Sequence, residues 1–328
     1  MELITKIYSA FDTSLMQWMT LVPSWLIQDA VVLILGALTV GFIVKHEKNP
    51  LPILLEFLCF MLLYAGIYEN LASVMGWYKF GRSWVMVFNV PITVPMIEYL
   101  FVYCCLRFCQ KAKFPTWTVP LFAGAMGVVA DLPLDPLAMV QRAITQEVPE
   151  GIGRWTWYIS PTDAQVLEVP IYNFSGWMLL CGYAAVWLLV GRHWYQKSGE
   201  KPSVGMLYPP IFMLIGLLTM CSPLSSFLLW LGPIFNRGDS IEYVMLGLCF
   251  VALAVSLILW RGKMRQRLAW KEDWIIPVVF GVFHFSILLF GLIGQHWKVV
   301  AFGLPFMFLQ MGIIAFGFTR KLPSEQEV

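Results

Sequence analysis

Nine apolar stretches, each long enough to cross a bilayer, constrain the fold of this chain more than any other feature. A transmembrane helix needs about 20 predominantly apolar residues to cross roughly 30 Å of hydrocarbon. The stretches lie near residues 26–44, 51–76, 84–108, 117–135, 170–191, 205–231, 240–260, 273–293 and 299–318. Only 13% of the 328 residues are charged, which is too few to cover a water-facing surface. We therefore predict an all-α, polytopic transmembrane helical bundle of about nine spans.

The distribution of Lys and Arg predicts the orientation of this bundle. If the amino terminus is outside, 15 of the 22 Lys and Arg residues fall in cytoplasmic segments and 7 fall outside. An excess of these residues in short cytoplasmic loops is typical of membrane proteins. We therefore expect the amino terminus outside and the carboxyl terminus in the cytoplasm. The net charge of +2 gives no reason to expect nucleic acid as a partner.

The segment before the first span is amphipathic. Apolar residues recur there every three or four positions, at Leu3, Ile7, Phe11, Leu15, Trp18 and Val22. This spacing predicts an interfacial helix over residues 1–25 rather than a cleaved signal peptide. We divide the remaining chain into a catalytic-type membrane half, residues 26–192, and an accessory membrane half, residues 193–328.

Polar residues are unevenly distributed among the predicted spans. Spans two to five hold Glu56, Glu69, Asn70, Asn89, Glu98, Asp131, Asp135 and Asn173. The last four spans hold His284 and Gln310, with Glu242 at one end. Ionisable groups inside a bilayer are costly, so they are usually paired or functional. We expect residues 51–192 to carry the function and the last four spans to form scaffold, lipid-facing wall or a surface for an oligomer or membrane-complex partner.

Four of these polar residues are predicted to lie at one depth in the membrane. Glu69 is late in an outward span, Asp131 and Asp135 end another outward span, and Asn173 begins an inward one. One interpretation is a shared site near the outer face. The alternative is that these residues cap helix ends and face lipid headgroups.

The same region contains a faint internal repeat. Each copy has an acidic residue, an aromatic cluster and then Val-Pro-Ile, at residues 90–92 in the first copy and 169–171 in the second. Proline is favoured in the first turn of a helix, where its missing N–H is not needed. We infer two pseudo-symmetric hairpins that bring Glu69 opposite Asp131 and Asp135.

Several kinds of chemistry are disfavoured by the residues present. The four His residues are scattered, unlike the clustered ligands of membrane di-iron enzymes, and the seven Cys fit simple packing. Asp131-x-x-x-Asp135 resembles half of the aspartate motifs of membrane prenyltransferases, but the second cluster that would hold Mg²⁺ is missing. Pro133 and Pro136 are also expected to break the helical face shared by the two aspartates. We expect no metal and no cofactor.

Proton transfer by a carboxylic acid in a dry, aromatic site is the chemistry that remains. A buried carboxyl group is a potential acid, and the faces of aromatic rings stabilise a nearby cation. A carboxyl group beside Trp155, Trp157 and Tyr158 could therefore protonate an alkene and shelter the resulting cation. Addition of water, isomerisation and cyclisation are all open outcomes of such a step.

The motifs of this region resemble a known family. They are Asp131 to Pro136, Gly153 to Trp157 and Val169 to Trp177, preceded by Gly76 to Tyr78 and Val90 to Pro95. This pattern resembles the CruF-type integral-membrane carotenoid biosynthesis proteins, which are 1′,2′-hydratases of γ-carotene and bacterioruberin precursors. Their pattern runs L-D-P, W-x-W and V-P-x-x-N-F-x-G-W, and the similarity covers residues 64–180. The resemblance implies addition of water to the terminal double bond of an acyclic carotenoid in the bacterial inner membrane.

The resemblance and the polar pattern together give a set of candidate residues. We expect Asp131 or Asp135 to donate the proton and Glu69 to act as its coupled partner or as the base that orients water. The substrate-binding candidates are Tyr78, Glu98, Trp155, Trp157, Tyr158, Asn173 and Trp177. The expected partners are a carotenoid or other polyisoprenoid substrate and the lipid bilayer.

Two other functions remain open at this stage. The chain could bind a carotenoid or polyisoprenoid, or serve as a complex subunit, without catalysis. It could also cyclise or isomerise a carotenoid end group, because Glu98 stands where the family has Trp. The segment Pro95-Met-Ile-Glu98 also partly resembles the Pro-x-Glu-Glu motif of membrane lycopene cyclases. A transporter is disfavoured because no inverted repeat with paired broken helices is visible.

Overall fold

A computed structural model of the chain describes residues 22–143, 152–159, 163–225, 241–261 and 267–319. The long helices of this part are α2 (Pro23–His46), α5 (Thr93–Lys111), α6 (Val119–Val140), α7 (Ile171–Lys197), α8 (Pro202–Met220), α10 (Ile241–Arg261), α12 (Ile275–Ile293) and α13 (Trp297–Thr319). Shorter helical segments are α3 (Pro50–Cys59), the π-helix η1 (Phe60–Tyr64), α4 (Ala65–Val74), the 3₁₀ turn η2 (Thr116–Thr118) and α11 (Trp270–Asp273). Residues 1–21, which hold most of the predicted interfacial helix, lie outside the described residues.

Eight helical segments in the described part are long and apolar enough to cross a membrane. They agree with eight of the predicted spans, and the segment Pro50–Val74 counts as one because α3, η1 and α4 are continuous. The predicted span over residues 84–108 differs. Its helix, α5, begins only at Thr93, and Glu98 and Arg107 lower its hydropathy. Most of α5 is nevertheless buried, which a helix at the centre of a bundle allows.

Two further sequence predictions need adjustment. The sixth span was expected over residues 205–231, whereas α8 ends at Met220, and residues 226–240 lie outside the described part. The expected boundary between the two membrane halves, at residue 192, falls inside α7, which continues to Lys197. The predicted halves are therefore joined by a continuous helix.

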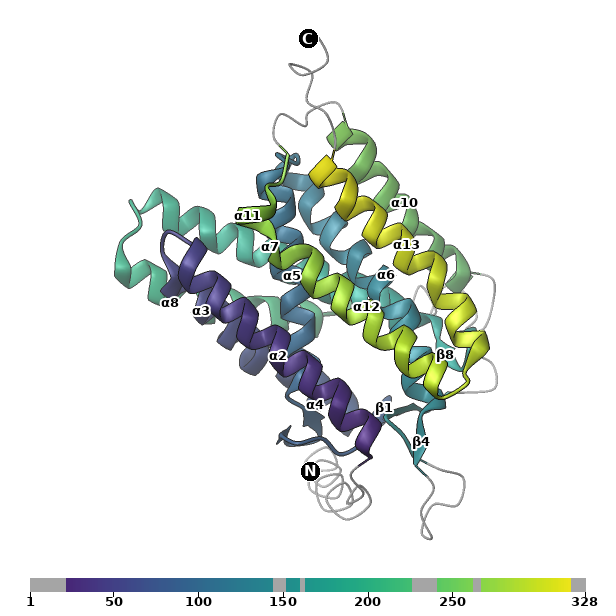
Figure 1. The fold of residues 1–328 in the computed structure, drawn as a ribbon. Helices are drawn as coiled ribbons and strands as arrows, with labels where there is room; N and C mark the ends of the chain where they lie inside the picture. Colours follow the sequence, from purple (N-terminus) through teal and green to yellow (C-terminus); the bar gives the residue numbers. More distant parts are fainter. Residues whose placement is uncertain (1–21, 144–151, 160–162, 226–240, 262–266, 320–328) are drawn as a thin grey trace, which may run out of the picture.

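Helix α6 lies at the centre of the bundle. It packs against α5, α7, α10, α12 and α13, while α2 packs against α3, α5 and α12 and α8 covers α3 and α7. Figure 1 shows α12, α13 and α10 beside α6, and α8 at the opposite side of the molecule. Nineteen of the 22 residues of α6 are buried, since small residues such as Gly124 and Gly127 allow close approach of α7.

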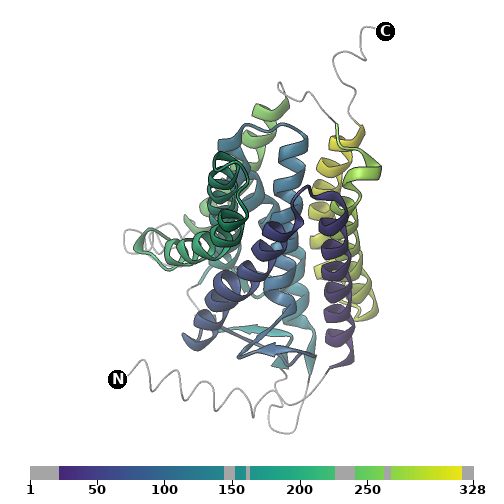
Figure 2. The same ribbon diagram turned by 90° about the vertical axis from the view of Figure 1, so that its left-hand side faces the viewer.

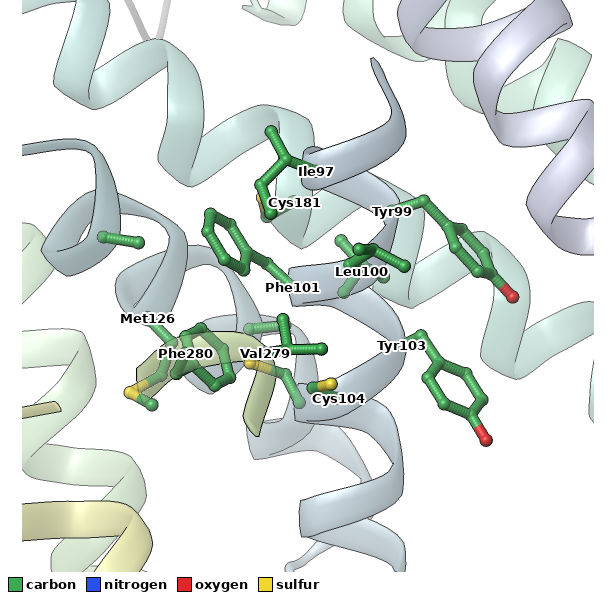
Figure 3. Packing of buried hydrophobic residues seen from close by; sticks show 14 of the residues in the cluster. Ile97, Tyr99, Leu100, Phe101, Tyr103, Cys104, Met126, Cys181, Val279 and Phe280 are labelled. Atoms are coloured by element: carbon green, nitrogen blue, oxygen red, sulfur yellow. The ribbon is translucent and has the colours of Figure 1, made fainter. Parts of the chain in front are cut away.

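The core between α5, α6, α7 and α12 is dense and aromatic. Phe101 stacks on Phe280 with ring centroids 5.0 Å apart and meets Phe283 edge-on at 4.8 Å. Figure 3 shows Phe101 of α5 and Phe280 of α12, with Cys181 of α7 and Met126 of α6 close by. The buried Cys residues serve as small packing groups here, as the sequence predicted.

Two buried ion pairs connect helices at the end of the bundle that holds the carboxyl termini of α2, α5 and α7. Arg192 of α7 donates two hydrogen bonds to Glu56 of α3, at 2.8 and 2.6 Å. Arg107 of α5 contacts Glu47 at 2.8 Å and Asp273 at 2.9 Å. Glu56 is thus a paired structural charge, which is the usual alternative to a functional one inside a membrane.

The opposite end of the bundle carries short strands, visible at the bottom of Figure 2. These are β1 (Tyr78–Phe80), β2 (Met86–Val87), β3 (Val90–Pro91), β4 (Arg142–Ala143), β5 (Ile152–Gly153), β6 (Trp155–Trp157), β7 (Gln165–Val166) and β8 (Val169–Pro170). Strands β1 and β6 pair antiparallel, and so do β2 with β3, β4 with β5 and β7 with β8. The pair β2–β3 replaces the first turns of the predicted third span, because Asn89 and Pro91 favour a turn and a late helix start.

Candidate functional site

The centre of the candidate site is a cluster of two aspartates and one asparagine between α6 and α7. The side-chain amide of Asn173 donates hydrogen bonds to Asp131, at 2.8 Å, and to Asp135, at 2.5 Å. The two carboxyl groups also lie close enough to interact with each other. Two carboxyl groups hydrogen-bond each other only when one of them carries a proton. The cluster therefore brings two interacting acids and one amide donor together.

The continuity of α6 brings the two aspartates together. They lie one helical turn apart, so their side chains share one face. The sequence prediction that Pro133 and Pro136 break this face is wrong, since α6 runs unbroken from Val119 to Val140. Gly303 of α13 packs directly against Pro133, which shows how a neighbouring helix accommodates the ring. Prolines are tolerated in membrane helices when neighbours re-satisfy the backbone.

A second pair of acids lies beside the first. Tyr78 of β1 donates a hydrogen bond to Glu69 of α4 at 2.5 Å, and the Glu69 carboxyl group lies close enough to that of Glu98 to interact with it. Asp135 interacts electrostatically with both glutamates. All four acids are buried, and Asp131 has no exposed surface. The interpretation in which these residues cap helix ends and face headgroups is therefore wrong.

Strand β6 places aromatic rings over the acids. Trp155 and Trp157 are buried, and both indole rings lie close enough to interact with Asp135, although the indole N–H of Trp157 lacks a well-formed hydrogen bond. Because side chains alternate across a strand, Tyr158 points the other way. It is 48% exposed and lies under the ammonium group of Lys79. The structure therefore places Tyr158 outside the site, contrary to the sequence prediction.

Two neighbouring pockets meet at this acidic cluster. Both are lined by Glu69, Tyr78, Glu98, Trp157, Asn173 and Trp177. The larger one encloses about 670 Å³, its open mouth included, and extends between α2, α5, α6 and α12. Asp135 lines it, whereas Asp131 lies behind Asp135 and lines neither pocket. The smaller one encloses about 450 Å³ and extends between α4 and α7.

The larger pocket has a polar wall that sequence reasoning missed. Arg154 donates hydrogen bonds to Asp29, at 2.6 Å, and to Gln28, at 2.5 Å. Asp29 also accepts hydrogen bonds from Ser83 and Thr93, at 2.5 and 2.8 Å. This network fixes the β1–β6 end of the bundle to α2 and α5. The signal that could have found it was the pair Gln28-Asp29 inside an otherwise apolar first span.

Helix α12 also contributes to the larger pocket. Phe283, Ser286 and Ile287 line it, although the sequence assigned the last four spans to scaffold or partner surface. The hydrogen bond between His284 and Gln310, and that from Gln310 to the carbonyl of Met126, hold α12 and α13 against α6. No sequence motif pointed to Phe283 or Ile287 of α12 as pocket residues, because apolar lining residues carry no signal beyond hydrophobicity.

The arrangement offers acid–base groups inside an apolar, aromatic cavity. Within the described residues, no three His, Cys, Asp or Glu side chains are grouped in a way suited to a metal ion. No known protein family, curated protein or solved structure matches this chain. The residues of the site itself are therefore the basis for its chemistry.

Proposed function

We propose that this chain is a membrane-embedded hydratase that adds water to the terminal double bond of an acyclic carotenoid end group. The observation that carries the proposal is the buried pair Asp131–Asp135, held by Asn173 at the wall of an apolar, aromatic pocket. An isolated trisubstituted alkene is apolar and reacts only with a strong, well-placed acid. A buried carboxylic acid beside aromatic rings supplies the acid and shelters the cation that forms.

Asp135 is the proton donor in this proposal, because it lines the pocket, and Asp131 is its positioning partner. The proton passes from Asp135 to the less substituted carbon of the double bond and leaves a tertiary cation on the other carbon. Trp155 and Trp157 lie on the Asp135 side of the pocket, where their ring faces stabilise this cation. The π-electrons of the alkene form the new C–H bond.

Water completes the reaction by adding to the cationic carbon. Glu69, which the hydrogen bond from Tyr78 holds in place, takes the surplus proton from the added water. The proton then returns to the aspartate pair within the same group of interacting acids. The net change is the addition of one water to one double bond, which requires no oxidant or reductant. The polar side chains of Gln28, Thr93 and Ser286 in the pocket wall offer hydrogen bonds to a water beside the apolar end group.

The membrane setting of the proposal follows from the eight apolar helices, with α5 as a ninth span at the centre of the bundle. We place the β1–β6 end of the bundle at the outer face and the Arg107 end at the cytoplasmic face of a bacterial inner membrane, following the distribution of Lys and Arg. A carotenoid dissolved in the bilayer then reaches the site laterally.

Pigment analysis of lycopene-producing bacteria that express the chain tests this function. The expected product is more polar than lycopene and heavier by one water. Asp135→Asn should lower its yield by about 10²- to 10⁴-fold, the usual contribution of a general acid. Asp131→Asn should lower it less, since Asp131 acts through Asp135. Asp273→Asn is the control, because Asp273 is a buried aspartate that pairs with Arg107 away from the pocket, so its loss should lower stability but not the yield per folded protein.

Other results would redirect the assignment. A product with the mass of lycopene would indicate cyclisation or isomerisation, with Glu98 as the next residue to replace. Unaltered lycopene bound to a well-expressed protein would indicate a carotenoid-binding protein. Full yield from both Asp131→Asn and Asp135→Asn would remove the aspartates from the mechanism.

A further inference from the structure

Two segments beside the pockets share one order of elements, namely a strand of the β1–β6 ribbon, a hairpin and a helix that follows Val-Pro-Ile. Strands β1 and β6 pair antiparallel with Lys79 opposite Thr156, so equivalent strands are related by a local two-fold axis. Each strand leads to a hairpin, β2–β3 or β7–β8, and each hairpin has a two-residue turn before Val-Pro-Ile. Phe88 in the first turn and Leu167 in the second have positive φ, 56° and 49°. Such a backbone is strained for these residues, so its recurrence at the same position supports the likeness of the two hairpins, although Glu168 of the second turn also has positive φ, at 67°.

This relation assigns matching walls to the two pockets. Counting from the Val-Pro-Ile segments, Ile97 of α5 corresponds to Gly176 of α7, and Glu98 corresponds to Trp177. Ile97 lines the larger pocket and Gly176 the smaller one. The ring pairs match as well, since Phe80 faces Trp155 across the ribbon and Tyr78 faces Trp157. The site thus has two lobes, one on each side of the acidic cluster.

The two lobes differ in how they are enclosed. In the larger lobe, which we call the closed lobe because most of its wall is buried, Val32, Ile97 and Phe283 are buried and only Ser286 and Trp177 of its wall are partly exposed. In the smaller lobe, which we call the open lobe, Tyr68, Trp77, Tyr172 and Gly176 are all partly exposed. The walls come from different helices, because α2 and α12 contribute lining residues to the closed lobe only. Helix α8 packs against α4 and α7 but contributes no lining residue to the open lobe.

The lobes also differ in chemistry. Polar groups, including Gln28, Thr93 and Ser286, line the closed lobe in addition to the shared residues. Aromatic and aliphatic side chains line the open lobe, and Trp157 meets Tyr172 edge-on at 6.0 Å. Flat aromatic walls suit a rigid, conjugated hydrocarbon, and polar groups suit water. The closed lobe therefore suits water, and the open lobe suits the hydrocarbon chain.

From these differences we infer that the open lobe between α4 and α7 is the lateral entrance for a linear polyene chain, and that the closed lobe receives its terminal end group together with water. The inference rests on the proposed function and names how the substrate is held. A chain that enters beside Tyr172 and Gly176 passes the acidic cluster, and its last double bond lies beside Asp135 in the closed lobe. The rest of the polyene remains in the membrane, so one small site serves a substrate much longer than either lobe.

Gly176 gives a clean test of the entrance. A Cβ atom at this position meets no other atom within 4 Å, so a larger side chain grows into the open lobe without a clash. Leucine is also a better helix former than glycine, so Gly176→Leu should fold. Gly41→Leu is the matched control, because Gly41 of α2 is equally open and lies outside both pockets.

Two readouts are needed, namely lycopene retained by the purified protein and hydration of a short probe. Gly176→Leu should retain at least about tenfold less lycopene than the wild type, a loss of roughly 1.4 kcal/mol in binding. Gly41→Leu should retain as much as the wild type. Hydration of a ten-carbon acyclic terpene with the same terminal double bond, which needs only the closed lobe, should fall by a smaller factor in Gly176→Leu than lycopene retention does.

The outcomes separate this inference from the proposed function. Normal lycopene retention in Gly176→Leu overturns the entrance, whether or not the protein hydrates lycopene. A wild-type protein that retains no lycopene also overturns it. Wild-type protein that retains lycopene without adding water contradicts the proposed function alone, and the retention assay still tests the entrance. If Gly176→Leu loses lycopene retention and hydration of the short probe by the same factor, the assignment of the polyene chain to the open lobe and of the end group to the closed lobe is overturned.

Discussion

Asn173 donates a hydrogen bond to Asp131 at 2.8 Å across the interface of α6 and α7. The same side-chain nitrogen lies 2.5 Å from Asp135, so a neutral amide joins two carboxyl groups from the adjoining helix. No cation among the described residues is hydrogen-bonded or ion-paired to either aspartate. The amide thus orients the pair without neutralising it by an opposite charge, which suits a group that must give its proton away.

Replacing Asn173 by aspartate should separate the contribution of its N–H donors from that of its side-chain size. Asn173→Asp keeps the size of the side chain but removes the N–H groups that hold the pair. We expect hydration to fall by about 10²-fold, comparable to the loss of one preorganised donor. Leaving buried oxygens unsatisfied should also lower thermal stability, by about 1–3 kcal/mol. Pigment yield and melting in detergent check the two effects, and Asn49→Asp, far from the pocket, is the control.

A similar yield for Asn173→Asp and the wild type would contradict the assigned role. So would a variant whose stability falls while its yield per folded protein stays unchanged, because the amide would then be structural only.

Tyr78 should support Glu69 over the whole accessible pH range. Burial raises the pKa of its phenol well above the usual range, and the nearby carboxyl of Glu69 raises this pKa further. The phenol therefore stays protonated in alkaline solution and continues to donate to Glu69. We expect Tyr78→Phe to lower hydration by about tenfold, by the same factor at neutral and alkaline pH, since one hydrogen bond to a charged group contributes about 1.5 kcal/mol or more.

The measurement is the yield of hydrated product in permeabilised cells at several pH values. Phe80 provides the comparison, because it lies on the same strand and has no hydroxyl, so Phe80→Leu should leave the pH profile unchanged. A Tyr78→Phe effect that disappears at alkaline pH would show that the phenol ionises and would contradict the prediction.

The sequence allowed prediction of the fold class and of the polar centre because both follow from strong local signals. Apolar runs of spanning length are easily recognised, and acids inside them are rare enough to stand out. Glu69, Asp131, Asp135 and Asn173 were expected to converge, and they do. The repeated Val-Pro-Ile segments also marked the two hairpins before helices α5 and α7.

Other features depended on tertiary contacts that no local pattern reports. Pro133 and Pro136 break a helix in isolation, but α6 continues because its neighbours, including α13 at Gly303, support it. Tyr158 was grouped with Trp157 because the two are adjacent, although strand alternation places them on opposite faces. The polar wall around Arg154 and the apolar residues of α12 come from distant segments, so spacing along the chain could not place them at the pocket.

The ion pair between Glu56 and Arg192 should contribute to stability and not to catalysis. Arg192 donates two hydrogen bonds to Glu56, and Tyr208 donates a third at 2.6 Å. Removing one partner leaves a buried charge without compensation, so Glu56→Gln should destabilise the protein by about 3–5 kcal/mol. The double variant Glu56→Gln with Arg192→Met should recover part of this loss. Melting in detergent measures both, and Lys48→Gln, which removes an exposed pair, should leave the melting temperature unchanged.

This prediction fails if Glu56→Gln melts like the wild type, or if it abolishes hydration while stability is retained. The second outcome would move Glu56 from the structural to the functional group of acids.

The proposed orientation predicts which end of the bundle faces the cytoplasm. Arg82 lies at the β1–β2 end and Lys113 follows α5 at the opposite end, and both side chains are exposed. In a protein whose exposed Cys221 is first replaced by Ser, Arg82→Cys should react with a membrane-impermeant maleimide in cells with an intact inner membrane. Lys113→Cys should react only after the inner membrane is permeabilised. Because the remaining described cysteines are buried, the variant without either new cysteine should give the background signal. The reverse pattern would place the acidic cluster near the cytoplasmic face, and the entrance for the polyene would then open in the inner leaflet.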